Sequence, residues 1–117
     1  MRILAVIPAR AGSKGIPNKN IRIVGGHPLI YYAIRNAKES RYITDIIVST
    51  DSPNVGLIAQ QMSVNIRWRE DKLCGDDVTL DAVIYDAIPH HVAWDYIITL
   101  QPTSPTLDVK TLDKAID

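Results

Sequence analysis

The chain contains 117 residues, the usual size of a single domain, and 46% of them are hydrophobic, which is enough for a packed core. Its 13 Lys and Arg residues balance 13 Asp and Glu, so the overall basic charge typical of nucleic-acid-binding proteins is absent. Cys74 is the single cysteine, which excludes an internal disulfide and fits a cytoplasmic protein. The opening segment "MRILAVIPAR" is too short for a signal peptide or a membrane span, so we expect no membrane partner.

Strands and helices are predicted to alternate along the whole chain. Apolar runs of strand length, rich in Ile and Val, alternate with segments in which apolar residues recur every three or four positions. Ser52 and Pro53 are typical of a helix start, and Pro28 suits the first turn of another helix. In chain order we predict a strand at 2–8, a helix from Pro28 to about Ser40, a strand at 45–51, a helix from Pro53, a strand at 64–68, a helix within 75–88, a strand at 94–100 and a final helix that Asp108 caps.

This alternation predicts an α/β fold with a largely parallel sheet and helices on both of its faces. The apolar run at 2–8 has no polar interruptions after Arg2, as expected for a strand buried on both sides. In such sheets ligands bind outside the carboxyl ends of the strands. We therefore expect the functional residues within 9–22, 49–51, 67–77 and 101–105.

The loop that follows the first strand has the composition of a phosphate-binding loop. Glycine backbone can approach a phosphate closely, successive N–H groups form an anion nest, and Arg and Lys neutralise the charge. The loop matches neither the Walker A pattern nor the dinucleotide pattern G-x-G-x-x-G. A solvated surface loop whose cations serve solubility is the alternative. The residues in question are Arg10, Gly12, Ser13, Lys14, Gly15, Lys19 and Arg22.

Four motifs in this order resemble one enzyme family. "IPARAGSKGIPNKN", "IIVSTD", "REDKL" and "LQPTSP" are similar to the motifs of the acylneuraminate cytidylyltransferases, the CMP-sialic acid synthetases. The resemblance implies a Rossmann-like fold of the nucleotide-diphospho-sugar transferase type. It also implies transfer of CMP from CTP to the anomeric hydroxyl of a nonulosonic acid such as N-acetylneuraminate, with release of pyrophosphate and with Mg²⁺ as cofactor.

The resemblance also assigns roles to individual residues. It places the loop against the phosphates of CTP, where Arg10 and Lys14 would stabilise the leaving pyrophosphate as catalytic residues. It assigns Arg69 to the nucleotide and places Thr79 near the cytosine. The nucleotide-binding set is Arg10, Gly12, Ser13, Lys14, Asn20, Arg69 and Thr79, and the set facing the acceptor sugar is Gln101, Thr103 and Ser104.

Several polar residues have a simpler structural interpretation. Asp51 could hold a metal or a ribose, but a turn or N-cap aspartate before Ser52 and Pro53 is the favoured interpretation. Capping also competes with function at Thr79, and it accounts for one of the adjacent Asp76 and Asp77.

The remaining chemically versatile side chains are expected to be structural. The three histidines have no metal-like spacing with Cys74, so we expect them to be ordinary turn or surface residues. Cys74 itself is predicted to be a small buried hydrophobic residue. Core or edge positions are expected for the aromatic residues Tyr31, Tyr32, Trp68 and Trp94.

Residues 1–117 are expected to form the N-terminal, nucleotide-binding part of a cytidylyltransferase domain. The resemblance implies a second half that carries the aspartates for Mg²⁺, further acceptor-sugar residues and a dimerisation segment, so no metal ligand is assigned to this chain. We expect a homo-oligomer, because truncation would leave an open sheet edge. The alternatives are a non-catalytic or truncated nucleotide-binding module, and a related transferase for a Kdo-type acid or another nucleoside triphosphate.

Overall fold

The computed structural model describes residues 1–9, 23–24, 26–73 and 78–101. Its elements are β1 (Ile3–Pro8), β2 (Ile23–Val24), β3 (His27–Pro28), α1 (Leu29–Glu39), β4 (Asp45–Thr50), α2 (Pro53–Gln61), β5 (Asn65–Trp68), the 3-10 helix η2 (Asp71–Leu73), α3 (Leu80–Ala87) and β6 (Tyr96–Thr99). The predicted alternation of strands and helices is confirmed as far as β6. The helix predicted after Asp108 lies outside the described residues.

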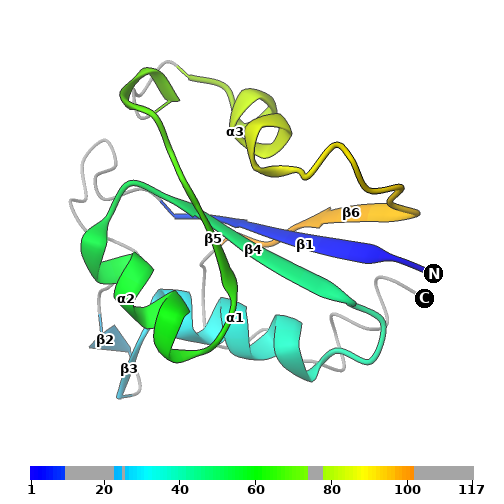
Figure 1. Cartoon of the computed structure of the whole chain (residues 1–117). Helices are drawn as coiled ribbons and strands as arrows, with labels where there is room; N and C mark the ends of the chain where they lie inside the picture. Colours follow the sequence, from blue (N-terminus) through cyan, green and yellow to red (C-terminus); the bar gives the residue numbers. More distant parts are fainter. Residues whose placement is uncertain (10–22, 25, 74–77, 102–117) are drawn as a thin grey trace.

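Four strands form one parallel sheet in the order β5-β4-β1-β6 (Figure 1). Because all of its strand pairs are parallel, the carboxyl ends of the strands meet at a single edge. β2 and β3 form a separate antiparallel pair, which the sequence had indicated only as a turn. Pro28 ends β3 and is the N-cap of α1, so its predicted position in the first helical turn was wrong by one residue.

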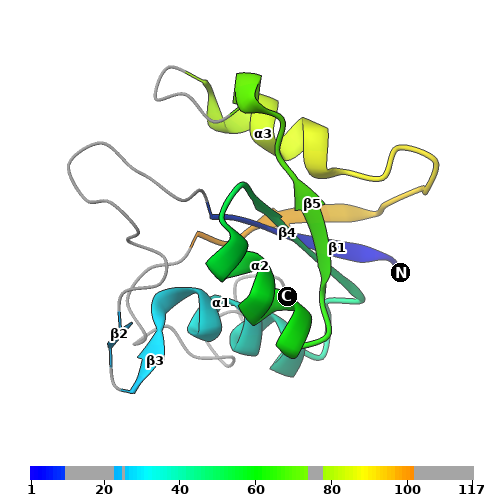
Figure 2. The ribbon, with the colours of Figure 1, turned by 60° about the vertical axis from the view of Figure 1, so that its left-hand side comes forward.

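The helices cover both faces of the sheet, as predicted. α1 and α2 lie on one face and α3 lies on the other (Figures 1 and 2). Side chains of β1 alternate between the two layers. Ala5 and Ile7 pack with α1 and α2, whereas Leu4 and Val6 pack with residues of α3. This burial on both faces is why the first strand reads as an uninterrupted apolar run.

The aromatic residues occupy both core and edge positions. Tyr32 is buried, whereas Trp68 at the edge strand β5 is 52% exposed. The ring of Trp68 lies against Gly56 of α2, and a Cβ atom at that position would overlap with it. Gly56 therefore permits the close approach of α2 and β5. No described helix is long and apolar enough to cross a membrane.

An ion pair joins the edge strand β5 to α3. Arg67 donates from Nε to Oδ2 of Asp86 at 3.2 Å and from Nη2 to Oδ1 at 3.0 Å. This two-fold hydrogen bond holds the pKa of Asp86 below its usual range, and the charge of Arg67 acts in the same direction. The same contact raises the pKa of Arg67. The pair links α3 to β5, while the apolar cluster that includes Ala87 packs α3 against β1 and β4.

We expect Ser52→Ala to lower the free energy of unfolding by about 1 kcal/mol, because Ser52 is the N-cap of α2. Its Oγ accepts a hydrogen bond from the Val55 N–H at 3.2 Å, and the residue is 2% exposed. Urea denaturation of the purified protein measures the change. Gln61→Ala, in the exposed last turn of the same helix, is the matched control. A loss no larger than that of the control would contradict the capping role.

We expect Asp86→Asn to lower stability at neutral pH and to have little effect in acid. A carboxyl group whose pKa is lowered by folding stabilises the protein above its unfolded pKa of about 4, and this contribution disappears as the pH falls through the folded value. Denaturation of both proteins at several pH values measures the difference between their free energies of unfolding. If this difference in free energy of unfolding were as large at about pH 3 as at neutral pH, the ionised pair would not be its cause.

Candidate functional site

The residues that follow the strands of the sheet lie at its carboxyl edge and are fixed by backbone hydrogen bonds. Ala9, directly after β1, donates from its N–H to the Ser49 carbonyl at 2.9 Å. Arg69, directly after β5, donates to the Thr50 carbonyl at 2.9 Å. Leu100, after β6, donates to Val6 at 3.0 Å. The chain segments that leave these strands therefore start from one well-defined edge, where the sequence predicted the site.

Three of the predicted site residues fall within the described part of the chain: Arg69, Thr79 and Gln101. Arg69 and Gln101 both follow strands at the carboxyl edge, β5 and β6 respectively. Thr79 instead begins α3 on one face of the sheet. Arg10, Gly12, Ser13, Lys14, Asn20, Thr103 and Ser104 lie outside the described residues. Because Ala9 is fixed at the edge, the predicted phosphate loop begins there.

Arg69 is held by the neighbouring strand β4. Its Nε donates to the Ser49 Oγ at 2.9 Å, and its Nη2 lies 3.3 Å from the Ser49 carbonyl oxygen, which accepts a second bond. The side chain is partly buried, so the guanidinium sits at the sheet edge in a defined orientation. Ser49 falls within the segment 49–51 where the sequence predicted functional residues, but the sequence assigned it no role. The signal that could have found it is a polar residue inside the buried strand "DIIVST".

Thr79 and Asp51 have the structural surroundings that their simpler interpretations require. Thr79 is the N-cap of α3, and its Oγ1 accepts a hydrogen bond from the Ala82 N–H at 3.2 Å. Its contact with the nucleotide stays a prediction. Asp51 is half-buried in the bend between β4 and α2, where Ser52, and not Asp51, caps the helix.

The side of the edge that faces α3 carries charges of both signs. The hydrogen bond from Arg67 is the main cause of the lowered pKa of Asp86, and the positive charges of Arg67, Lys72 and Arg69 act in the same direction. Lys72 also pairs with the exposed Glu70 at 3.3 Å. Arg69 lies next to the start of the glycine-rich loop, because its Nη2 and the Ala9 N–H share the Ser49 carbonyl, and this position suits an anionic ligand such as a nucleoside triphosphate.

Within the described ranges, no group of three or more His, Cys, Asp or Glu side chains could hold a metal ion. The ligands for Mg²⁺ therefore stay an expectation, and Cys74, Asp76 and Asp77 lie outside these ranges.

The histidines are exposed, as predicted. His27 stacks on Tyr31 with ring centroids 4.0 Å apart, and Nε2 of His90 lies 2.9 Å from the Tyr85 carbonyl oxygen.

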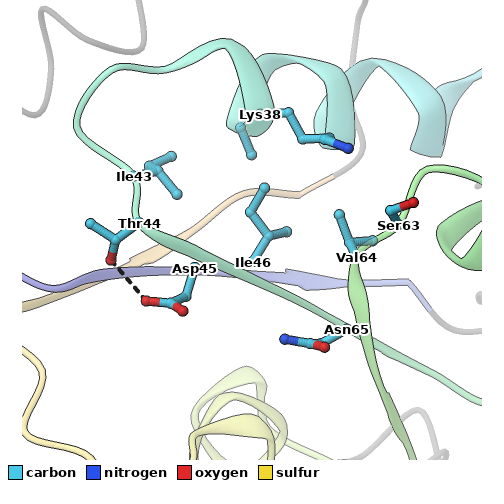
Figure 3. A pocket seen from close by; sticks show the side chains of 9 residues that line it. Lys38, Ile43, Thr44, Asp45, Ile46, Ser63, Val64 and Asn65 are labelled. Atoms are coloured by element: carbon cyan, nitrogen blue, oxygen red, sulfur yellow. Dashed lines mark hydrogen bonds between the residues drawn. The ribbon is translucent and has the colours of Figure 1, made fainter.

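A pocket of about 310 Å³ lies at the opposite, amino edge of the sheet (Figure 3). It is lined by Ala37, Lys38, Ile43, Thr44, Asp45, Ile46, Ser63, Val64 and Asn65. Three of its polar side chains, Lys38, Thr44 and Asp45, already bond to protein partners. The Lys38 ammonium donates to the Met62 carbonyl at 2.6 Å, and Thr44 donates to Asp45 at 2.8 Å. The carboxyl edge, with the defined position of Arg69, is therefore the better candidate site.

Comparisons with known proteins match nearly the whole chain. CMP-N,N'-diacetyllegionaminic acid synthase from Legionella pneumophila is 39% identical over 122 aligned positions, which cover 100% of this chain and 53% of that protein. N-acylneuraminate cytidylyltransferase from Escherichia coli is 35% identical over 115 positions, which cover 98% of this chain and 27% of that protein. The chain thus spans about half the length of the first of these relatives and about a quarter of the second.

A solved structure shares the fold. The structure of CMP:2-keto-3-deoxy-manno-octonic acid synthetase complexed with CTP superimposes with a TM-score of 0.79 at 24% identity, covering 99% of this chain and 46% of that one. The Rossmann-like transferase fold expected from the motifs is therefore confirmed. A family profile described as cytidylyltransferase matches residues 4–117. Since this match covers almost every residue, the chain belongs to the cytidylyltransferase family.

Proposed function

We propose that the protein carrying this sequence transfers CMP from CTP to the anomeric hydroxyl of a nonulosonic acid and releases pyrophosphate. The observation that carries this proposal is the position of Arg69, held by Ser49 at the edge where the predicted phosphate loop begins. Membership of the cytidylyltransferase family supports it. The names of the relatives, which refer to legionaminic and acylneuraminic acids, support a sugar acid of this class as acceptor.

The proposed reaction needs positioning and charge neutralisation more than covalent catalysis. The anomeric oxygen attacks the α-phosphorus in line with the leaving oxygen, and its proton is released. The bond from the α-phosphorus to the bridging oxygen breaks, so that pyrophosphate leaves with additional negative charge. Cations beside the β- and γ-phosphates stabilise that charge, and this is the role we propose for Arg10 and Lys14.

Arg69 suits the binding of the nucleotide. A guanidinium group stays charged at all physiological pH values and donates hydrogen bonds in a planar fork. The contacts to Ser49 fix the plane of this fork before any ligand arrives, which lowers the entropy lost on binding. Gln101, exposed after β6 at the same edge, is proposed to face the acceptor. Mg²⁺ is proposed as the cofactor, and we assign none of its ligands to this chain.

We also propose a cytoplasmic homodimer that acts on small molecules, and not on nucleic acids or membranes. The balanced charge of 13 cationic and 13 anionic side chains supports the absence of a nucleic-acid partner. Two strands, β5 and β6, pair on one side only within the described residues, which supports an oligomer that covers an edge. Sedimentation of the full-length protein measures its oligomeric state.

Pyrophosphate release tests the proposed reaction. We expect the full-length protein to release pyrophosphate from CTP with Mg²⁺ when N-acetylneuraminate, legionaminate or pseudaminate is supplied. ATP, GTP and UTP are the nucleotide controls, and Kdo tests the related acceptor. If no acid led to release of pyrophosphate but CTP still bound, the enzyme proposal would be wrong, and the protein would be a non-catalytic nucleotide-binding module. Turnover with UTP or GTP but not CTP would refute the cytidylyl assignment.

We expect Arg69→Ala in the full-length protein to weaken CTP binding about tenfold, the effect of losing one hydrogen bond from a charged group. Isothermal titration calorimetry measures the dissociation constant. Arg67→Ala is the matched control, because this neighbouring arginine is engaged by Asp86 and points to α3. The control should lower stability but leave the CTP affinity unchanged. Equal affinity losses in both variants would indicate a general effect of charge and not a contact by Arg69.

A further inference from the structure

Ser49 is the buried residue on which two parts of the candidate site converge. It is the fifth residue of β4, its exposed fraction is 0%, and in the sheet it stands between Pro8 of β1 and Arg67 of β5. Its carbonyl oxygen accepts the Ala9 N–H at 2.9 Å and also the Arg69 Nη2 at 3.3 Å. Its hydroxyl oxygen accepts the Arg69 Nε at 2.9 Å. One residue therefore contacts both the start of the predicted phosphate loop and the predicted nucleotide-binding arginine.

The direction of the Ser49 side chain follows from the alternation along β4. Ile47 packs in the apolar cluster that includes Ala87 of α3, whereas Val48 packs on the opposite side with α1 and α2. Ser49, two residues after Ile47, therefore faces the α3 side. Arg67 contacts α3 on that same side. Arg69 comes two residues later, and alternate residues of an extended chain point to the same face.

A hydroxyl group at this buried strand position is energetically unfavourable, and filling the core does not explain why it is there. A buried hydroxyl group is unfavourable unless it forms a hydrogen bond, and an apolar side chain would serve a doubly covered strand better. The partner of this hydroxyl is the guanidinium of Arg69. The Oγ atom thus satisfies its own hydrogen-bonding requirement by fixing a cation at the carboxyl edge of the sheet.

We propose that Ser49 is a positioning residue for CTP binding, which acts by holding the guanidinium of Arg69 in its binding orientation. The inference rests on the proposed function, because it assigns Ser49 a role at that same nucleotide site. An arginine that is already immobilised loses less conformational entropy when the ligand binds. Without the hydroxyl contact, the long side chain samples other rotamers, and the affinity for CTP falls.

Substitution of the side chain isolates this role, because the two contacts of the Ser49 carbonyl belong to the backbone. Ser49→Ala removes the Oγ acceptor and leaves the Ala9 N–H with its partner. Ser49→Cys keeps the approximate size of the side chain but offers only a weak acceptor, so it serves if the alanine variant does not fold. Ser49→Thr keeps the hydroxyl and is the rescue variant, since β-branched residues suit strands.

The experiment is a double-mutant cycle for CTP binding in the full-length protein, measured by calorimetry. We expect Ser49→Ala and Ser49→Cys to weaken CTP binding about fivefold, and Ser49→Thr to retain most of the affinity. In the Arg69→Ala background, Ser49→Ala should have no further effect, because the side chain that it positions is absent. Thermal unfolding without ligand is recorded for each variant, so that a change in stability is separated from a change in affinity.

The outcomes distinguish the positioning role from the proposed function. An unchanged affinity in both Ser49→Ala and Ser49→Cys would overturn the positioning role while leaving CTP as the ligand. An equal loss in the wild-type and Arg69→Ala backgrounds would also overturn it, because the effect would then not pass through Arg69. If the wild-type protein itself showed no preference for CTP over UTP and GTP, the proposed function would fail together with the inference that rests on it.

Discussion

The parallel pairing of β1 with both β4 and β6 is the constraint on which the candidate site depends. β1 is buried on both faces, and its register with its neighbours fixes where each strand ends. Burial of this apolar strand between two helical layers supplies much of the hydrophobic driving force for the fold. Together with the pairing of β5 to β4, this pairing of β1 brings the ends of the four strands to one edge, so the fold and the candidate site depend on the same register.

At the carboxyl edge, charged side chains are held by a hydrogen-bonded backbone. The main-chain bonds of Ala9 and Arg69 to β4 extend the sheet by one residue beyond two of its strands. The guanidinium of Arg69, directly after β5, is then fixed by Ser49 of the neighbouring strand β4. Groups that bind a triphosphate are most effective when they are oriented before the ligand arrives, because less freedom is then lost on binding.

The sequence was a good guide to the regular elements and a poorer guide to local chemistry. Burial on both faces leaves a pattern that is readable as an apolar run, and the Ser52-Pro53 start of α2 has a direct capping mechanism. The β2–β3 pair was missed because strands of two residues carry no periodicity. Pro28 was misplaced by one residue because proline suits both an N-cap and the first turn.

Side-chain roles at the site could be predicted only in part. Arg69 was identified through a family motif, and the structure places it at the expected edge. Thr79 has the same sequence signal whether it caps a helix or contacts a nucleotide, and its capping bond is visible only in three dimensions. Ser49 lay in a segment expected to be functional but received no role, because its contact is with a partner 20 positions away in the sequence. Such contacts between strands leave no local pattern.

A crystal structure of the full-length protein with CTP tests the central claim most directly. The account predicts the nucleotide at the carboxyl edge of the sheet, in contact with Arg69, while Ser49 still accepts the hydrogen bond from the Arg69 Nε. The contradicting result is a nucleotide bound elsewhere, for example in the amino-edge pocket lined by Lys38 and Asp45, or an Arg69 side chain that is turned away from the bound nucleotide.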